Sequence, residues 1–308
     1  MRKRLLVTGY GGFVAGSVVK QASDEWDITA ISRSPVANGR ADVNSVQLDL
    51  RERSVLQDVF EGIRPHAVIH AAAMANIDHC QSHPDEAEAV NVGVTKQLVR
   101  LCRDHGTKMV FCSTDTVFDG ANGMYTEKDE PHPLNVYAET KVRAEQIVRG
   151  GLDDAVIARL SLVMGFYLIG AGNSFLARMI ADFKAGKPNQ LPANEIRTPI
   201  DVITLGRALL ELAGGKFTGI VHLAGNTRLN RHEMACRIAQ RLGFAQELAV
   251  ATDSNAMTGR APRPNDASLD NALARQILKT PMRSFDDGLE LVLTTAETIR
   301  NGQPQNST

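Results

Sequence analysis

Continuous apolar runs alternate with amphipathic stretches along the first half of the chain. The apolar runs cover residues 4–7, 26–31, 46–50, 67–73, 108–112 and 155–161. Helical periodicity fills the stretches 13–21, 53–61 and 84–104, and a further helix opens at 135–141. Uninterrupted apolar strands separated by helices are typical of a parallel sheet that is buried on both faces. The pattern predicts an α/β fold with a Rossmann-type, doubly wound parallel sheet.

The pattern changes after residue 162. A glycine-rich stretch at 165–172 and a loop at 188–192 precede amphipathic helices at 201–212 and 231–242, with a strand between them at 219–223. We expect a dinucleotide-binding domain over 1–162, a smaller C-terminal substrate lobe over 163–300, and a polar, flexible tail over 301–308. Some strands and helices of the second part can return to the main domain.

A glycine-rich turn separates the first predicted strand from the first predicted helix. Gly9 and Gly12 let the backbone bend sharply and come close to a ligand. The helix that begins near Phe13 directs its free N–H groups toward an anion. No Gly-Lys-Ser/Thr follows the glycines, which disfavours a phosphate-loop NTPase. The turn predicts a pyrophosphate site, and an ordinary structural turn is the alternative.

The end of the second predicted strand bears on the choice of cofactor. NAD-binding folds place an acid there to hold the ribose hydroxyls, and this chain has none. Ser32, Arg33 and Ser34 offer a cation and hydroxyl donors, which suit a 2′-phosphate. We therefore expect NADP, with NAD as the alternative cofactor. For Arg33 itself, the alternative is a solvated side chain at the end of a strand.

Three residues form the candidate catalytic set. Tyr137 and Lys141 are four residues apart and share one face of a predicted helix. A neighbouring ammonium favours the phenolate of a tyrosine, whose usual pKa is about 10, and so makes acid-base catalysis accessible. Thr114 ends a predicted strand at the ligand-binding edge of the sheet, where its hydroxyl can polarise a carbonyl. On spacing alone, a surface Tyr-Lys pair is the alternative.

Composition and charge favour small-molecule chemistry. The chain has 34 basic and 35 acidic residues and a net charge of -1, which gives no reason to expect nucleic acid or a membrane as partner. It has no apolar run of about 18 residues, and its four cysteines show no disulfide framework, so we expect a cytoplasmic protein. His79, Cys80 and His83 match no standard zinc spacing, and we expect no metal.

Together these segments resemble the extended short-chain dehydrogenases/reductases, and within them the dTDP-4-dehydrorhamnose reductases and related sugar-nucleotide enzymes. The resemblance rests on residues 8–15, 48–50, 70–73, 89–92, 113–120, 125–127, 133–141, 221–225 and 262–264. It implies hydride transfer from NADPH to a 4-keto nucleotide sugar, with Tyr137 as the proton donor and Thr114 and Lys141 completing the catalytic set. It also implies a homodimer formed through the helices that begin at Pro84 and Tyr137.

The resemblance assigns further residues to ligands. Those implied to bind the cofactor are Gly9, Gly12, Phe13 and Val14 at the pyrophosphate, Asp49 and Leu50 at the adenine, and Ala71, Ala72 and Ala73 along the cofactor backbone. Lys141 would bond to the nicotinamide ribose. Thr114 and Asp115 would touch the sugar, and Arg263 would clamp the substrate diphosphate.

Three stretches depart from the dTDP-4-dehydrorhamnose reductase pattern. Phe13-Val14-Ala15 replaces Gln-Leu-Gly in the phosphate turn, and Leu162 replaces the tryptophan that follows Arg-Thr-Ser. The acidic pair expected after Val202 is absent. Two alternatives therefore stay open: an NAD(P)-dependent sugar-nucleotide epimerase or dehydratase, and a non-catalytic NADP-binding regulatory subunit that resembles the β subunit of methionine adenosyltransferase.

Overall fold

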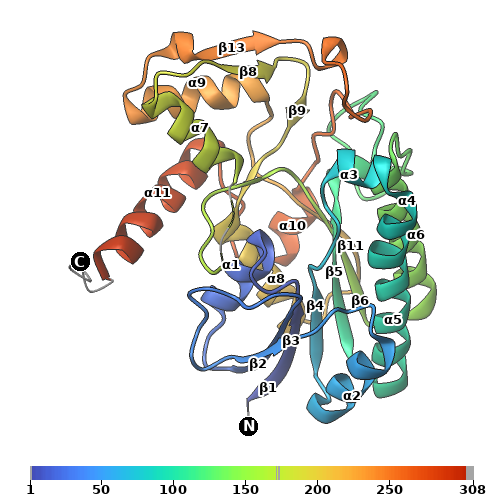
Figure 1. The fold of residues 1–308 in the computed structure, drawn as a ribbon. Helices are drawn as coiled ribbons and strands as arrows, with labels where there is room; N and C mark the ends of the chain where they lie inside the picture. The colour runs from blue at the N-terminus through green and yellow to red at the C-terminus, as the bar shows by residue number, and fades with distance from the viewer. Residues whose placement is uncertain (1, 171, 173, 303–308) are drawn as a thin grey trace.

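A parallel sheet organises the main body of the molecule (Figure 1). The computed structural model describes residues 2–170, 172 and 174–302. Within these ranges, seven strands form the central sheet in the order β11-β6-β5-β4-β1-β2-β3, and every neighbouring pair is parallel. The strands are β1 (Lys3–Thr8), β2 (Trp26–Ser32), β3 (Asn44–Gln47), β4 (Ala67–His70), β5 (Lys108–Thr114), β6 (Ala155–Leu160) and β11 (Gly219–Leu223). The predicted fold class is confirmed.

Helices cover both faces of this sheet (Figure 1). On one face lie α1 (Phe13–Gln21) and α8 (Val202–Gly214), and on the other lie α2 (Arg53–Ile63), α5 (Val94–His105) and α6 (Val136–Gly151). Successive strand residues point to opposite faces. Leu5 and Val7 therefore enter the first core, whereas Leu6 enters the second. This two-sided burial explains why the strands read as uninterrupted apolar runs.

The helix predicted over 84–104 contains a π-helical segment. It consists of α4 (Pro84–Ala87), the π-helix η1 (Glu88–Gly93) and α5. Asn91, within η1, is buried: its Oδ1 accepts a hydrogen bond from Met74 N at 2.8 Å, and its Nδ2 donates to Thr140 Oγ1 at 3.0 Å. Single π turns occur often at functional sites. This one brings a polar side chain inward at a position that regular apolar periodicity does not reveal.

The predicted third strand also differs from the structure. The apolar run at 46–50 predicted a strand there, but β3 ends at Gln47 and residues 48–50 form the loop that follows. Leu48 is buried from this loop, and its N–H donates to Ser32 O at 2.8 Å. The apolar residue therefore marks burial beside the sheet edge and not strand geometry.

The second half of the chain builds a smaller lobe over the carboxyl ends of the strands (Figure 1). The lobe contains α7 (Phe175–Lys184), α9 (Arg231–Leu242), α11 (Phe285–Gly302), and the paired strands β8 (Asn189–Pro192) and β13 (Ala249–Thr252). β11 and α8 instead belong to the main sheet, where β11 pairs with β6 and α8 packs on α1. Of the tail expected to be flexible, 301–302 belong to α11 and 303–308 lie outside the described residues.

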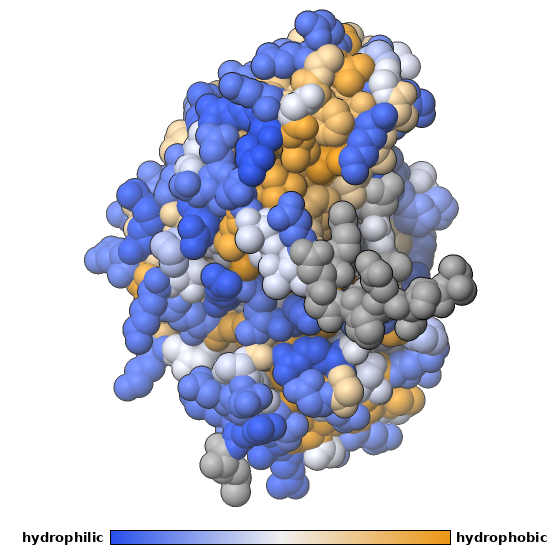
Figure 2. Space-filling view, turned by 90° about the vertical axis from the view of Figure 1, so that its left-hand side faces the viewer, coloured by the Kyte–Doolittle hydropathy of each residue, from blue (hydrophilic) through white to orange (hydrophobic). Residues whose placement is uncertain are grey.

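Several short elements complete the fold. They are α3 (Ile77–Ser82), α10 (Ala272–Ile277), and the two-residue strands β7 (Val163–Met164), β9 (Ile196–Arg197), β10 (Ile200–Asp201) and β12 (Leu229–Asn230). Figure 2 shows that apolar surface gathers on the side of the smaller lobe. None of the described helices is both long and apolar enough to span a bilayer.

Candidate active site

The glycine turn lies between β1 and α1, as the sequence predicts. Gly9 has φ +82°, and a Cβ at this position would lie 2.9 Å from Ala72 N. A Cβ at Gly12 would lie 2.8 Å from Gly9 O. Gly12 is the N-cap of α1 and provides no side-chain cap. The N–H groups of Phe13 and Val14, in the first turn, therefore begin a helix whose positive end suits a phosphate.

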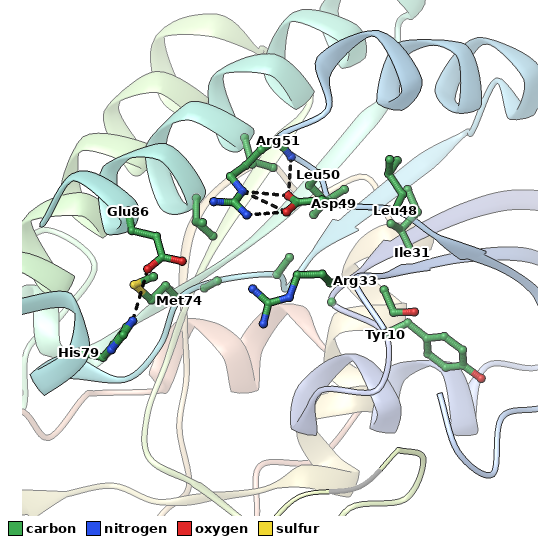
Figure 3. Close-up of a pocket in the computed structure, with 16 residues that line it drawn as sticks. Tyr10, Ile31, Arg33, Leu48, Asp49, Leu50, Arg51, Met74, His79 and Glu86 are labelled. Carbon is green, nitrogen blue, oxygen red and sulfur yellow. Dashed lines mark hydrogen bonds and ion pairs between the residues drawn. The ribbon is translucent and has the colours of Figure 1, made fainter. Parts of the chain in front are cut away.

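A cavity of about 390 Å³ adjoins this turn (Figure 3). Its walls include Gly9, Ser32, Arg33, Asp49, Leu50, Ala72 and Ala73, which the sequence had assigned to the cofactor. The other residues assigned to the cofactor are not among its lining residues: Gly12, Phe13, Val14, Ser34, Ala71, Tyr137 and Lys141. The lining also contains nine residues that sequence reasoning missed: Tyr10, Ile31, Leu48, Arg51, Met74, His79, Glu86, Val90 and Val94.

Two features of this cavity fit an adenosine that carries a 2′-phosphate. Ser32 Oγ is buried and has no hydrogen-bond partner among the described residues. Arg33 extends into the cavity beside it (Figure 3). Within the described part of the chain no carboxylate pairs with Arg33, so its charge is available to a phosphate.

Asp49 and Arg51 neutralise one another at the same wall. Arg51 Nη2 lies 2.6 Å from Asp49 Oδ2, and Arg51 Nε donates to Asp49 Oδ1 at 3.0 Å. These bonds lower the pKa of Asp49 to about 2. The carboxylate is therefore ionised, and Arg51 contributes less free positive charge to the cavity than Arg33 does.

The structure brings the candidate catalytic residues to the carboxyl end of β5. Thr114 is the last residue of this strand, and Tyr137 and Lys141 lie on the first two turns of α6. Asn135 caps α6 by accepting a hydrogen bond from Ala138 N at 2.9 Å. Tyr137 is half-buried and Lys141 is buried.

Burial dominates the proton affinities of this pair. It raises the pKa of the Tyr137 phenol, and the nearby Thr114 hydroxyl acts in the opposite direction. It lowers the pKa of Lys141 to about 8. The sequence had suggested that the ammonium lowers the pKa of the phenol. In the structure Lys141 Nζ instead donates to Cys112 O at 2.7 Å and lies 4.0 Å from the centroid of the Phe111 ring.

A buried histidine, which sequence reasoning missed, lies behind this lysine. His70 Nδ1 is 2.7 Å from Thr8 Oγ1, and His70 Nε2 is 3.1 Å from Thr95 Oγ1. Burial, together with the charge of Lys141, lowers the pKa of His70 to about 3. A neutral imidazole therefore joins β4, β1 and α5 beneath the cofactor turn.

Asp115 faces the smaller lobe and pairs with an arginine from it. Arg197 Nε lies 3.4 Å from Asp115 Oδ2, and Arg197 Nη2 donates to Pro264 O at 3.1 Å. Burial raises the pKa of Asp115, whereas the charge of Arg197 opposes that change. Arg263, which the resemblance assigns to a substrate diphosphate, bonds to Asp78 of α3 at 2.7 Å from Nη2 to Oδ2.

A smaller cavity of about 170 Å³ lies between α7, β8 and α9. Arg231 lines it, with its guanidinium 5.0 Å from the centroid of the Phe175 ring. Arg231 Nη1 and Asn189 Nδ2 are buried donors without hydrogen-bond partners among the described residues. Burial also lowers the pKa of Arg231 to about 10. Two unsatisfied donors beside an aromatic ring can receive a polar, anionic or planar ligand group.

Comparisons with known proteins identify the family of this chain. A family model described as RmlD substrate binding domain matches residues 2–298. Methionine adenosyltransferase 2 subunit beta of Bos taurus is 29% identical over 276 residues, which are 87% of this chain and 80% of that protein. The probable low-salt glycan biosynthesis reductase Agl14 of Haloferax volcanii is 28% identical over 289 residues, which are 92% of this chain and 95% of that protein.

A solved structure extends the likeness to the fold. The dTDP-4-dehydrorhamnose reductase of Bacillus anthracis, in complex with NADP, matches with a TM-score of 0.85 and 26% identity, covering 96% of this chain and 99% of that one. The expected resemblance to extended short-chain dehydrogenases/reductases is thereby confirmed. Because the family model spans nearly the whole chain, the protein belongs to the RmlD substrate binding domain family.

Proposed function

We propose that this protein is an NADPH-dependent reductase of a 4-keto nucleotide sugar. The observation that carries the proposal is that the Tyr137 phenol interacts with the Thr114 hydroxyl at the end of β5, while Lys141 Nζ bonds to Cys112 O of the same strand. The cavity beside Ser32 and Arg33 supports NADP as the cofactor, with NAD as the alternative. The NADP-bound reductase from Bacillus anthracis supports the same choice.

The proposed chemistry divides between the cofactor and the chain. Bound NADPH would supply the hydride that the carbonyl carbon accepts. Tyr137 donates its phenolic proton to the carbonyl oxygen, so the ketone becomes an alcohol. Burial raises the pKa of Tyr137, so the phenol is protonated in neutral solution and holds the proton that it donates. Thr114 donates a hydrogen bond to the same oxygen, and Lys141 would bond to the nicotinamide ribose.

The smaller cavity supports a nucleotide as the rest of the substrate. Arg231 would neutralise a phosphate, and the Phe175 ring and the Asn189 amide would contact a base. The charges of Asp115 and Arg197 act on Arg231, and Asp115 directly follows Thr114 in the chain, so a sugar attached to a diphosphate would extend from Arg231 toward Thr114. The nature of the sugar and of the base stays open.

Consumption of free NADPH in the presence of 4-keto nucleotide sugars tests the proposal. We expect the Tyr137→Phe variant to lose about 10²- to 10⁴-fold in turnover, because it lacks the proton donor. Its NADPH affinity should stay near that of the wild type. A Tyr125→Phe variant serves as the matched control, since the Tyr125 hydroxyl donates to Asp119 Oδ1 at 2.6 Å and has no part in the proposed proton transfer. Undiminished turnover by Tyr137→Phe would show that another group donates the proton.

A non-catalytic regulatory subunit is the second candidate. The 29% identity to methionine adenosyltransferase 2 subunit beta favours it. NADPH binding without turnover of any 4-keto nucleotide sugar would support this candidate. An epimerase or dehydratase would instead transform its substrate without net consumption of NADPH.

We also infer a homodimer and a cytoplasmic location. The α4–α5 surface exposes the acidic Asp85 toward one end and the basic Arg100 toward the other. A two-fold antiparallel pairing of this surface would place unlike charges together. The free cysteines, of which Cys80, Cys102 and Cys112 are buried, suit a reducing compartment. A sedimentation mass equal to one 33.4 kDa chain would refute the dimer.

A further inference from the structure

We propose that Glu145 is a positioning residue for the catalytic set: its carboxylate fastens the helix that carries Tyr137 and Lys141 to the two strands beside it. The inference rests on the proposed function, because it concerns the same reacting groups. Glu145 contacts neither substrate nor cofactor in this proposal. Its action passes through the backbone of α6 and the end of β5.

The first step is the register of α6. Tyr137, Lys141 and Glu145 follow one another at intervals of four residues and therefore lie on one face of the helix. Lys141 and Glu145 are both buried against the sheet. Any tilt or rotation of α6 that displaced Glu145 would displace the other two side chains as well.

The second step is the set of bonds that Glu145 makes. Its Oε1 accepts a hydrogen bond from Ser113 Oγ, and Ser113 directly precedes Thr114 on β5. Its Oε2 accepts a hydrogen bond from Arg159 Nη2 of β6 at 2.9 Å, and Arg159 Nε donates to Oε1 at 3.1 Å. One carboxylate thus joins α6, β5 and β6 within one helical turn of Lys141.

The third step concerns the guanidinium. Arg159 is only 2% exposed, and it lies 5.1 Å from the centroid of the Phe118 ring. Its planar fork matches the two oxygens of Glu145, a geometry that a lysine ammonium does not reproduce. Arg159 Nη1 is buried without a hydrogen-bond partner among the described residues, as is His222 Nε2. The guanidinium of Arg159 is therefore held mainly by its hydrogen bonds to Glu145.

The fourth step separates positioning from stability. The free energy that it costs to remove two charges from water offsets most of their mutual attraction. An apolar pair of similar volume therefore often stabilises a core equally well. An apolar pair, however, makes no directional hydrogen bonds that fix the orientation of the helix. The charged pair fixes where α6 stands relative to Thr114, and it places an anion near Lys141, where it favours the ammonium.

The experiment compares three variants of the full-length protein. Glu145→Gln breaks the charge pairing, and Glu145→Met/Arg159→Met removes both charges together. Asp154→Asn is the matched control, because Lys108 Nζ bonds to Asp154 Oδ1 at 2.7 Å at the opposite end of β5. For each variant we would measure the Tm, the steady-state kcat and KM with a 4-keto nucleotide sugar, and the pH profile of kcat.

We expect kcat to fall by about tenfold or more in Glu145→Gln and in the double variant, with KM unchanged, since small misplacements of reacting groups are costly. The double variant should keep a Tm near that of the wild type, and Asp154→Asn should keep its kcat. Wild-type kcat and pH profile in a double variant of normal Tm would overturn the proposal. A purely structural role predicts that outcome.

Amide hydrogen exchange makes the test independent of turnover. Loss of positioning should speed exchange of residues 136–141 by about tenfold in Glu145→Gln, whereas Asp154→Asn should leave it unchanged. If the wild type turns over no 4-keto nucleotide sugar, the proposed function fails, and this exchange measurement still decides whether Glu145 fastens α6. Equal exchange in both variants would overturn the proposal.

Discussion

Arg263 forms a two-pronged ion pair with Asp78, a residue 185 positions away in the chain. Arg263 Nη1 bonds to Asp78 Oδ1 at 3.0 Å and Arg263 Nη2 to Asp78 Oδ2 at 2.7 Å. Ala261 N also donates to Asp78 Oδ1 at 2.9 Å. These bonds lower the pKa of Asp78. They tie the loop that follows β13 to α3, which neighbours the cofactor cavity through His79.

This pair gives the first prediction. If Arg263 acts by holding the loop in place, Arg263→Met and Asp78→Asn should raise the KM for a nucleotide sugar by the same factor. A partly exposed pair of this kind contributes about 1 kcal/mol, which corresponds to about fivefold. Steady-state kinetics of both variants provide the measurement. A rise confined to Arg263→Met would instead support the diphosphate clamp that the resemblance implies.

The second prediction concerns cofactor choice. Arg33→Ala should weaken NADPH binding by about 10- to 100-fold and leave NADH binding nearly unchanged, because only the 2′-phosphate meets the guanidinium. Arg51→Ala should have a smaller effect, since Asp49 already neutralises Arg51. Fluorescence titration with each cofactor measures both affinities. Equal losses for NADPH and NADH would place the 2′-phosphate elsewhere.

Much of this arrangement could be predicted from the sequence. Gly9 and Gly12 are informative because their backbone geometry excludes a side chain, and α1 has the bounds expected from periodicity. Local order of this kind leaves a local signal. The signal from the apolar residues Val90 and Val94 is ambiguous. Their helical periodicity fits a face buried in the core and equally fits a wall of the cofactor cavity, which both residues line.

Contacts between distant segments could not be predicted in the same way. Arg263 looked free in the sequence, and only the packing of α3 brings Asp78 to it. His70 gave no signal, since its partners Thr8 and Thr95 lie on other elements. Arg231 Nη1 has no hydrogen-bond partner among the described residues because no acceptor from another segment packs beside it. The packing of distant segments leaves no local signal in the sequence.

The third prediction concerns stability and pH. The pKa of Lys141 falls from its ordinary value of 10.5 to about 8 in the folded protein. The unfolded chain therefore binds this proton more tightly, so the lysine destabilises the folded state below pH 8 and the penalty disappears as the pH rises toward 10.5. Lys141→Met should remove a penalty of up to about 3 kcal/mol at pH 7, less about 1 kcal/mol for the lost bond to Cys112 O.

Chemical denaturation at two pH values checks this balance. Lys141→Met should unfold at a higher denaturant concentration than the wild type at pH 7, and the difference should vanish near pH 10. The variant should also lose turnover, as expected where a strained active-site group serves function at the expense of stability. A variant less stable than the wild type at pH 7 would show that the ammonium is better satisfied by its surroundings than burial alone implies.

The fourth prediction concerns Arg231 and the smaller cavity. Its guanidinium is mostly buried with one donor unsatisfied, and Glu195 keeps a second partner because Arg260 Nη2 lies 2.9 Å from it. Arg231→Met should therefore leave the Tm unchanged or higher in the absence of nucleotide. It should also abolish most of the rise in Tm that UDP or dTDP causes in the wild type, because a phosphate loses its cation.

Arg237→Met, on the exposed side of the same helix and paired with Asp286, removes an equal charge and should keep the full rise. Inorganic phosphate alone should raise the Tm less than either nucleotide, since it reaches neither the Phe175 ring nor the Asn189 amide. A nucleotide response that survives in Arg231→Met would move the nucleotide out of this cavity.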